Sequence, residues 1–157
     1  MDVRVLAVAD MERVLLAARR IAVLGIKPES RRALDAHQIP LYLQKVGYAI
    51  VPVPIRYPEA SEILGVPVAR RLTDVAGPVD VVSVFVKPDD FAPYLADLVL
   101  LRPGVAWFQS GLLRPPFAEA LAKAGIPVAE DCIGCRRASI EPSWAPLAGQ
   151  APGGPAR

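Results

Sequence analysis

The chain has 157 residues, 53% of them hydrophobic and 22% charged, with a formal net charge of +2. This length fits one domain with a core of its own, and the composition excludes a disordered chain. The near-neutral charge argues against nucleic-acid binding, and the absence of a long apolar run argues against a membrane helix or a signal peptide. We therefore expect a cytoplasmic protein with reduced cysteines, no membrane contact and no nucleic-acid partner.

Hydrophobic periodicity predicts alternating helices and strands along the first half of the chain. Asp10 can cap the first helix, and Pro40 must lie near the first turn of the second, because a proline inside a helix would kink it. The expected elements are, in order, a helix at 10–20, a strand at 21–24 that ends at Gly25, a helix at 35–46, a strand at 48–53, a short edge strand at 66–68 and a helical turn at 73–75.

The second half repeats this alternation more clearly. Its predicted elements are a strand at 80–86, a helix at 88–101, a strand at 105–108, a helix at 115–124 and a strand at 126–129. Such alternation predicts an α/β fold with a Rossmann-like, open, mainly parallel sheet of five to six strands and helices on both faces. Residues 1–141 would form this single domain. Residues 142–157, rich in Ala, Pro and Gly, are expected to be a disordered tail.

Ligands of open parallel sheets bind beyond the carboxyl ends of the strands, where the strand order reverses. Gly25 ends the first predicted strand ahead of a helix N-terminus that would favour an anion such as pyrophosphate, although no G-x-G-x-x-G follows and an ordinary turn is an equal interpretation. Five cations fall on loops at this edge, which indicates either a mouth for a polyphosphate or a chance cluster of charges: Lys27, Arg31, Arg32, Arg56 and Lys87.

Arg56 follows the second long strand, where NAD-binding domains usually carry an acidic residue for the ribose hydroxyls. A guanidinium at that position suits a phosphorylated ribose, as in NADP or coenzyme A. A solvated surface arginine is the alternative. The chain has 17 prolines and lacks asparagine, which is a trend of heat-adapted proteins, so a thermophilic source is a further expectation.

Several short segments, taken in their order and spacing, carry a resemblance. They are 21–25, 42–43, 47–48, 51–53 with Arg56 and Tyr57, 62–65, 80–85, 107–111 and 131–133. Together they resemble the small stand-alone CoA-binding proteins, which look like the CoA-binding domain of the succinyl-CoA synthetase alpha subunit without its partner domains. The resemblance runs from about Val14 to Ser139. This chain differs from the family's pattern at Lys27 and at Pro54-Ile55.

The resemblance implies coenzyme A or an acyl-CoA as the ligand, bound at the carboxyl ends of the strands. It implies pyrophosphate contacts near the first strand, a ribose phosphate at Arg56, adenine near the third long strand and a pantetheine arm beside the last two. The predicted cofactor-binding residues are Gly25, Ile26, Lys27, Arg31, Arg32, Pro54, Arg56, Tyr57, Val86, Lys87, Pro88, Gln109, Gly111 and Cys132.

No catalytic residue is predicted, and a binding module without catalysis, or one that acts with a partner, is preferred. His37 is the only histidine and is expected at the surface or in a capping role; with Cys132 and Cys135 it cannot fill a tetrahedral zinc site within one chain. The alternatives are an NADP-binding oxidoreductase-like domain, a thiol redox protein that uses Cys132 and Cys135, and a scaffold domain without a ligand. A homodimer is expected only because dimers are common.

Overall fold

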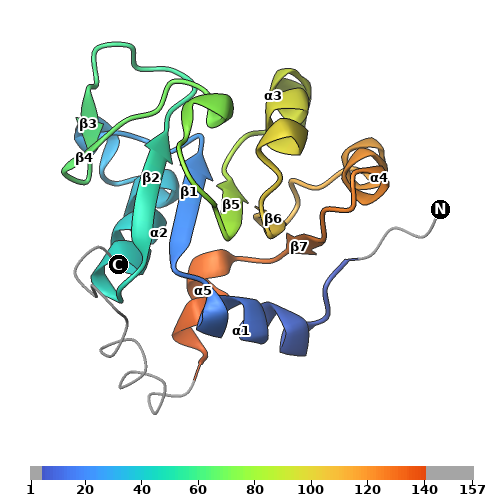
Figure 1. Cartoon of the computed structure of the whole chain (residues 1–157). Helices are drawn as coiled ribbons and strands as arrows, with labels where there is room; N and C mark the ends of the chain where they lie inside the picture. Colours follow the sequence, from blue (N-terminus) through green and yellow to red (C-terminus); the bar gives the residue numbers. More distant parts are fainter. Residues whose placement is uncertain (1–4, 141–157) are drawn as a thin grey trace.

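Five parallel strands form the central sheet, in the order β2-β1-β5-β6-β7 (Figure 1). The computed structural model describes residues 5–140, so the predicted tail at 142–157 lies outside the described residues. The fold is therefore the α/β, Rossmann-like fold that the sequence predicted, and its strand order reverses between β1 and β5. The strands are β1 Arg20–Leu24, β2 Ala49–Val53, β5 Val81–Val84, β6 Val105–Phe108 and β7 Val128–Glu130.

Helices cover both faces of this sheet (Figure 1). Helices α1 Val8–Ala17, α2 Asp35–Lys45 and α5 Ile133–Ala138 pack on one face, and α3 Pro88–Leu101 and α4 Pro115–Lys123 pack on the other. Alternate residues of each strand supply the two cores, because successive strand side chains point to opposite faces. Of the helices within residues 5–140, none combines the length and the apolar character that a bilayer crossing requires.

Two expectations about helix ends are wrong. The first helix begins at Val8, so Asp10 lies in its first turn, where it pairs with Arg13, and Ala7 occupies the capping position. Pro40 lies inside α2, in its second turn. The carbonyl of Ala36, which the proline nitrogen cannot bond, accepts the N–H of Lys27 at 3.0 Å instead. A partner from the preceding loop therefore lets the helix continue through the proline.

The segment between β2 and β5 forms a small separate hairpin. Strands β3 Glu62–Ile63 and β4 Val66–Pro67 pair antiparallel around Leu64 and Gly65, both of which have positive φ, as a two-residue hairpin turn of type I′ requires. The edge strand predicted at 66–68 is therefore present as β4, and its partner β3 was not predicted. Ile63 is fully buried and anchors the hairpin to the core on the α2 face. A 3-10 turn at Leu72–Asp74 follows.

Candidate functional site

The loops after β1 and β5 meet where the strand order reverses. Gly25 has φ +89°, and a Cβ atom built on it would lie 2.6 Å from the carbonyl oxygen of Phe85. Gly25 donates its N–H to the carbonyl of Val53 at 2.9 Å, and Phe85 donates to the carbonyl of Leu24 at 2.8 Å. These contacts lock three neighbouring strand ends together. We call this closely packed backbone at the switch point the closed floor of the site, because a ligand at the carboxyl edge of the sheet would lie against it.

The loop from Gly25 to α2 is held by its backbone. Ile26 is buried. Lys27 donates its N–H to the carbonyl of Ala36, and its own carbonyl accepts a hydrogen bond from Nδ1 of His37 at 2.8 Å. His37 is 4% exposed, so the expected surface role is wrong; the ring fixes the loop from within α2. The backbone of Lys27 is thus held in place, and its side chain lies against Tyr57, with Nζ 5.3 Å from the centre of the ring.

A pocket of about 210 Å³ opens beyond the carboxyl ends of β1 and β2, against α3. Its walls are mostly apolar, with a few polar groups, which is the usual character of a small-molecule site. The strand ends supply Leu24, Val53 and Ile55; the other lining residues are Arg70, Arg71, Leu72, Pro93, Tyr94 and Asp97.

Two neighbouring arginines build one wall of this pocket. Arg71 binds the carboxylate of Asp97 with Nε at 3.0 Å and a terminal nitrogen at 2.8 Å. The hydrogen bonds from Arg71 hold the pKa of Asp97 below its usual value, and the carboxylate raises the pKa of Arg71. Arg70 donates to the carbonyls of Tyr57 at 3.2 Å, Pro58 at 3.1 Å and Ala60. Both arginines thus shape the pocket and its adjoining loop.

The depressed pKa of Asp97 predicts a pH-dependent contribution to stability. The stabilisation is complete above the unfolded pKa of about 3.9 and is lost as pH falls through the lower folded pKa. Asp97→Asn should therefore be clearly less stable than wild type at pH 6. The difference in stability between the two proteins, the gap, should shrink toward pH 2.5. Thermal unfolding across this range measures it. Asp89→Asn, an exposed site on the same helix, is the control; a gap that does not change with pH would contradict the assignment.

The other half of the edge is tied together by Gln109, which directly follows β6. Its Nε2 donates to Ser83 Oγ of β5 at 3.0 Å, and its Oε1 accepts the N–H of Ile133 in α5 at 3.0 Å. Gly111 donates its N–H to Glu130 Oε2 at 3.0 Å. Gln109 and Gly111, both predicted site residues, therefore hold the edge in shape with the hydrogen bonds that they make.

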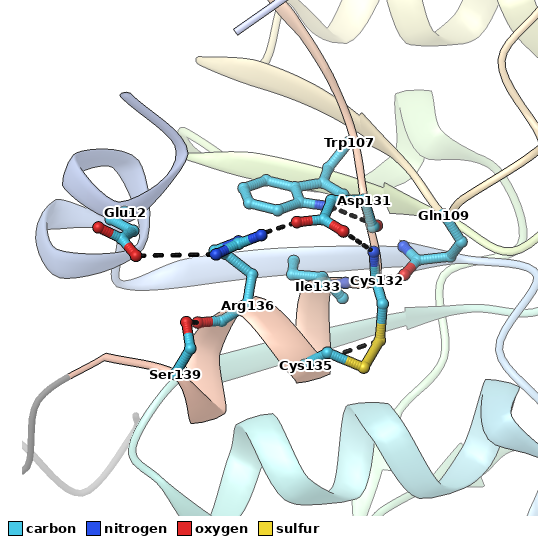
Figure 2. Close-up of polar contacts among 9 residues, drawn as sticks. All are labelled: Glu12, Trp107, Gln109, Asp131, Cys132, Ile133, Cys135, Arg136 and Ser139. Carbon is cyan, nitrogen blue, oxygen red and sulfur yellow. Dashed lines mark hydrogen bonds and ion pairs between the residues drawn. A yellow bond between two sulfur atoms is a disulfide. The ribbon is translucent and has the colours of Figure 1, made fainter. Parts of the chain in front are cut away.

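The cysteines are joined as a disulfide, so the expectation of reduced thiols is wrong for this structure (Figure 2). Cys132 directly precedes α5, and Cys135 lies in its first turn. One helical turn brings their Cα atoms to 5.2 Å, within the range that a disulfide needs. The expectation relied on the redox state of a compartment. It took no account of this helix, which had not been predicted.

The predicted site residues not described above form a buried or half-buried group and an exposed group. Pro54 and Val86 are buried, and Pro88 is the first residue of α3. The exposed group is cationic: Arg32 donates to the carbonyl of Glu29 at 3.2 Å, and no hydrogen bond or ion pair within residues 5–140 engages the side chains of Arg31, Arg56 and Lys87. These three charges thus face solvent at the carboxyl edge of the sheet.

Sequence reasoning missed most of the pocket lining. Arg70, Arg71 and Leu72 come from a stretch whose weak periodicity gave no clear element. Tyr94 and Asp97 lie on α3, whose first turn alone had been assigned to the edge. The adjacent arginines were the one available signal, since such a pair so close to a strand end is a candidate for pairing with an acidic helix residue.

The chain is similar to proteins of one family. The sequence pattern of the CoA binding domain matches residues 19–138. The uncharacterized protein YneT of Bacillus subtilis (strain 168) is 30% identical over 126 residues, which are 80% of this chain and 90% of YneT. The structure of cell-free ID.343 from Thermus thermophilus is 34% identical with a TM-score of 0.77, over 85% of this chain and 98% of that one.

A hypothetical protein from Pyrococcus horikoshii OT3 is also similar. It is 26% identical with a TM-score of 0.75, and the match spans 88% of this chain and 96% of that chain. These matches extend over nearly the whole length of each relative. The residues matched by the family pattern, 19–138, include every residue of the edge described above.

Proposed function

The chain belongs to the CoA binding domain family, and from that premise we propose that it binds coenzyme A or an acyl-CoA at the carboxyl edge of its sheet. The observation that carries the proposal is the pocket of about 210 Å³ at the ends of β1 and β2, adjoined by a cation whose side chain has no hydrogen-bond or ion-pair partner within residues 5–140. Ile55 lines the pocket, and Arg56, the next residue, is exposed. An apolar ring and a phosphate can therefore be held side by side.

We place the adenine ring in this pocket and the ribose phosphate at Arg56. The pocket walls are Leu24, Val53, Ile55, Leu72, Pro93 and Tyr94 on their apolar side. Val86, Lys87 and Pro88, which the resemblance implied as neighbours of the adenine, are not among the lining residues. Lys87, exposed at the start of α3, is in this proposal a charge for the phosphates.

The pyrophosphate and the pantetheine arm of coenzyme A would cross the switch point, where the strand order reverses. Lys27, beside the Tyr57 ring, supplies one cation above the closed floor at Gly25. From there the arm would run along the ends of β5 and β6 toward Gln109 and Cys132. Loops at one edge of a parallel sheet lie side by side, so a ligand of this length can touch all of them.

We propose a binding module that does not itself catalyse a reaction and that works alone or with a protein partner. The buried polar groups near the edge are used for structure: Asp97 binds Arg71, His37 binds the carbonyl of Lys27, and Ser83 binds Gln109. None of these pairs is a free acid or base facing the pocket. A group that transfers protons would need such freedom.

Thermal unfolding with different nucleotides tests this function. A ligand that binds only the folded state at 100 times its dissociation constant should add about 2.7 kcal/mol. Coenzyme A and acetyl-CoA should raise the midpoint, and dephospho-CoA, which lacks the ribose phosphate, should raise it less. A larger rise with NADP than with coenzyme A would favour the oxidoreductase-like alternative, and no rise with any of them would reject a nucleotide site.

A further inference from the structure

We propose that the Cys132–Cys135 disulfide is a thiol–disulfide exchange site for the thiol of bound coenzyme A. The inference rests on the proposed function, because the nucleotide would bring its own thiol to the cysteines. It adds a chemical step, the reversible oxidation of a ligand thiol, to a module otherwise without chemistry. The co-reactants are the free thiol and the disulfide of the same coenzyme.

The cysteines lie at the same edge of the sheet as the pocket. Strand β7 ends at Glu130, and Cys132 follows two residues later, before α5 (Figure 2). Gln109 connects β5 with the start of α5, because it donates to Ser83 of β5 and accepts the N–H of Ile133, the residue after Cys132. A chain of direct contacts therefore connects the strand next to the switch point with the disulfide.

The two sulfur atoms differ in their surroundings. Cys135 is exposed and Cys132 is half-buried. The Cys132 sulfur also accepts the backbone N–H of Cys135 at 3.1 Å. A thiolate formed at Cys132 would keep this hydrogen bond, which favours the charged form and makes Cys132 the better leaving group. An incoming thiol should therefore attack Cys135.

The exchange balances without any further oxidant. A coenzyme A thiolate attacks the Cys135 sulfur, the Cys132–Cys135 bond breaks, and Cys132 leaves as a thiolate that takes up a proton. A second coenzyme A thiolate attacks the ligand sulfur of the mixed disulfide and releases coenzyme A disulfide and the Cys135 thiolate. Two ligand thiols are oxidised, and one protein disulfide is reduced to two thiols. The reverse sequence reduces coenzyme A disulfide.

The backbone around the pair is fixed independently of the disulfide. Asp131 accepts the N–H of Cys132 at 2.8 Å and binds Nε of Arg136 at 2.8 Å, and its carbonyl accepts the indole N–H of Trp107 at 3.0 Å (Figure 2). Gly134 packs so closely on Ile39 that a Cβ atom would lie 3.0 Å from it. The disulfide can therefore open and close while α5 stays in place.

Oxidation kinetics of the reduced protein test the proposal. Coenzyme A disulfide should oxidise the two thiols about 100-fold faster than glutathione disulfide, because binding raises the effective concentration of the reacting sulfur. Desulfo-coenzyme A, which lacks the thiol, should compete and slow the reaction. Intact mass after alkylation of free thiols follows both reactions. In Cys132→Ser, Cys135 should retain one covalently bound coenzyme A, and Cys135→Ser should react far more slowly.

The outcomes separate this proposal from the proposed function. Equal rates for the two disulfides, with desulfo-coenzyme A still raising the unfolding midpoint, would overturn the exchange site and leave the binding function intact. No rise of the midpoint with desulfo-coenzyme A would overturn both. If the variants fail to fold, the two wild-type rates and their competition by desulfo-coenzyme A still decide the question.

Discussion

Gly25→Ala should lower the free energy of unfolding by about 3 kcal/mol or more. A residue with a side chain pays about 1–3 kcal/mol to hold a strongly positive φ, and Gly25 has φ +89°. The new Cβ would also lie 2.6 Å from the carbonyl oxygen of Phe85, a distance that real Cβ atoms do not reach, so the loops after β1 and β5 must separate. The same separation would open the floor of the site and weaken ligand binding. Urea unfolding of the two proteins measures the loss.

Gly125→Ala is the matched control. Gly125 has φ +76° but nothing lies within 4 Å of its added Cβ, so this variant should show the conformational cost alone, about 1–2 kcal/mol. The difference between the variants reports the close approach of the two loops. Equal losses would show that these loops do not meet as described.

Arg56→Gln should weaken coenzyme A binding by about 10- to 100-fold, the range for loss of hydrogen bonds to a charged group. The affinity for dephospho-CoA should change little, because that ligand lacks the phosphate that the guanidinium would hold. Arg56 is exposed and makes no hydrogen bond within residues 5–140, so its loss should leave the fold intact. Isothermal titration of both ligands measures the two affinities.

Arg19→Gln is the control for charge. Arg19 is also exposed, but it precedes β1 and so lies at the opposite, amino-terminal edge of the sheet. It should change the affinity for coenzyme A by less than about twofold under the same salt conditions, because screened distant charges matter little. Equal losses in the two variants would mean that net charge, and not a phosphate contact at Arg56, attracts the ligand.

The fold was predictable because its elements carry strong periodic signals. The helix at Pro88–Leu101 and the strand at Val105–Phe108 have the predicted bounds. Pro40 misled the prediction because the carbonyl of Ala36, which the proline cannot bond, accepts the N–H of Lys27 from outside the helix. Helix α5 was missed because its six residues, Ile133–Ala138, are too few to display an apolar period.

The position of residues at the carboxyl edge of the sheet was predictable only where it depends on chain order. Gly25, Lys27 and Arg56 follow strand ends, and parallel topology places all strand ends at one edge. The pocket itself depends on the pair formed by Arg71 and Asp97, whose partners are 26 residues apart in sequence. The two adjacent arginines mark one side of this ion pair in the sequence, but no local pattern identifies Asp97 as the partner, because the packing of α3 against the segment before it brings the two together.

The most direct test of the central claim is a backbone amide NMR titration with coenzyme A. The account predicts saturable shifts that concentrate on the loops after β1, β2 and β5 and on residues 109–111 and 131–133, with the amino ends of the strands unchanged. A titration without saturable shifts, or with shifts centred on the amino edge around Arg19 and Asp80, would contradict a coenzyme A site at the carboxyl edge.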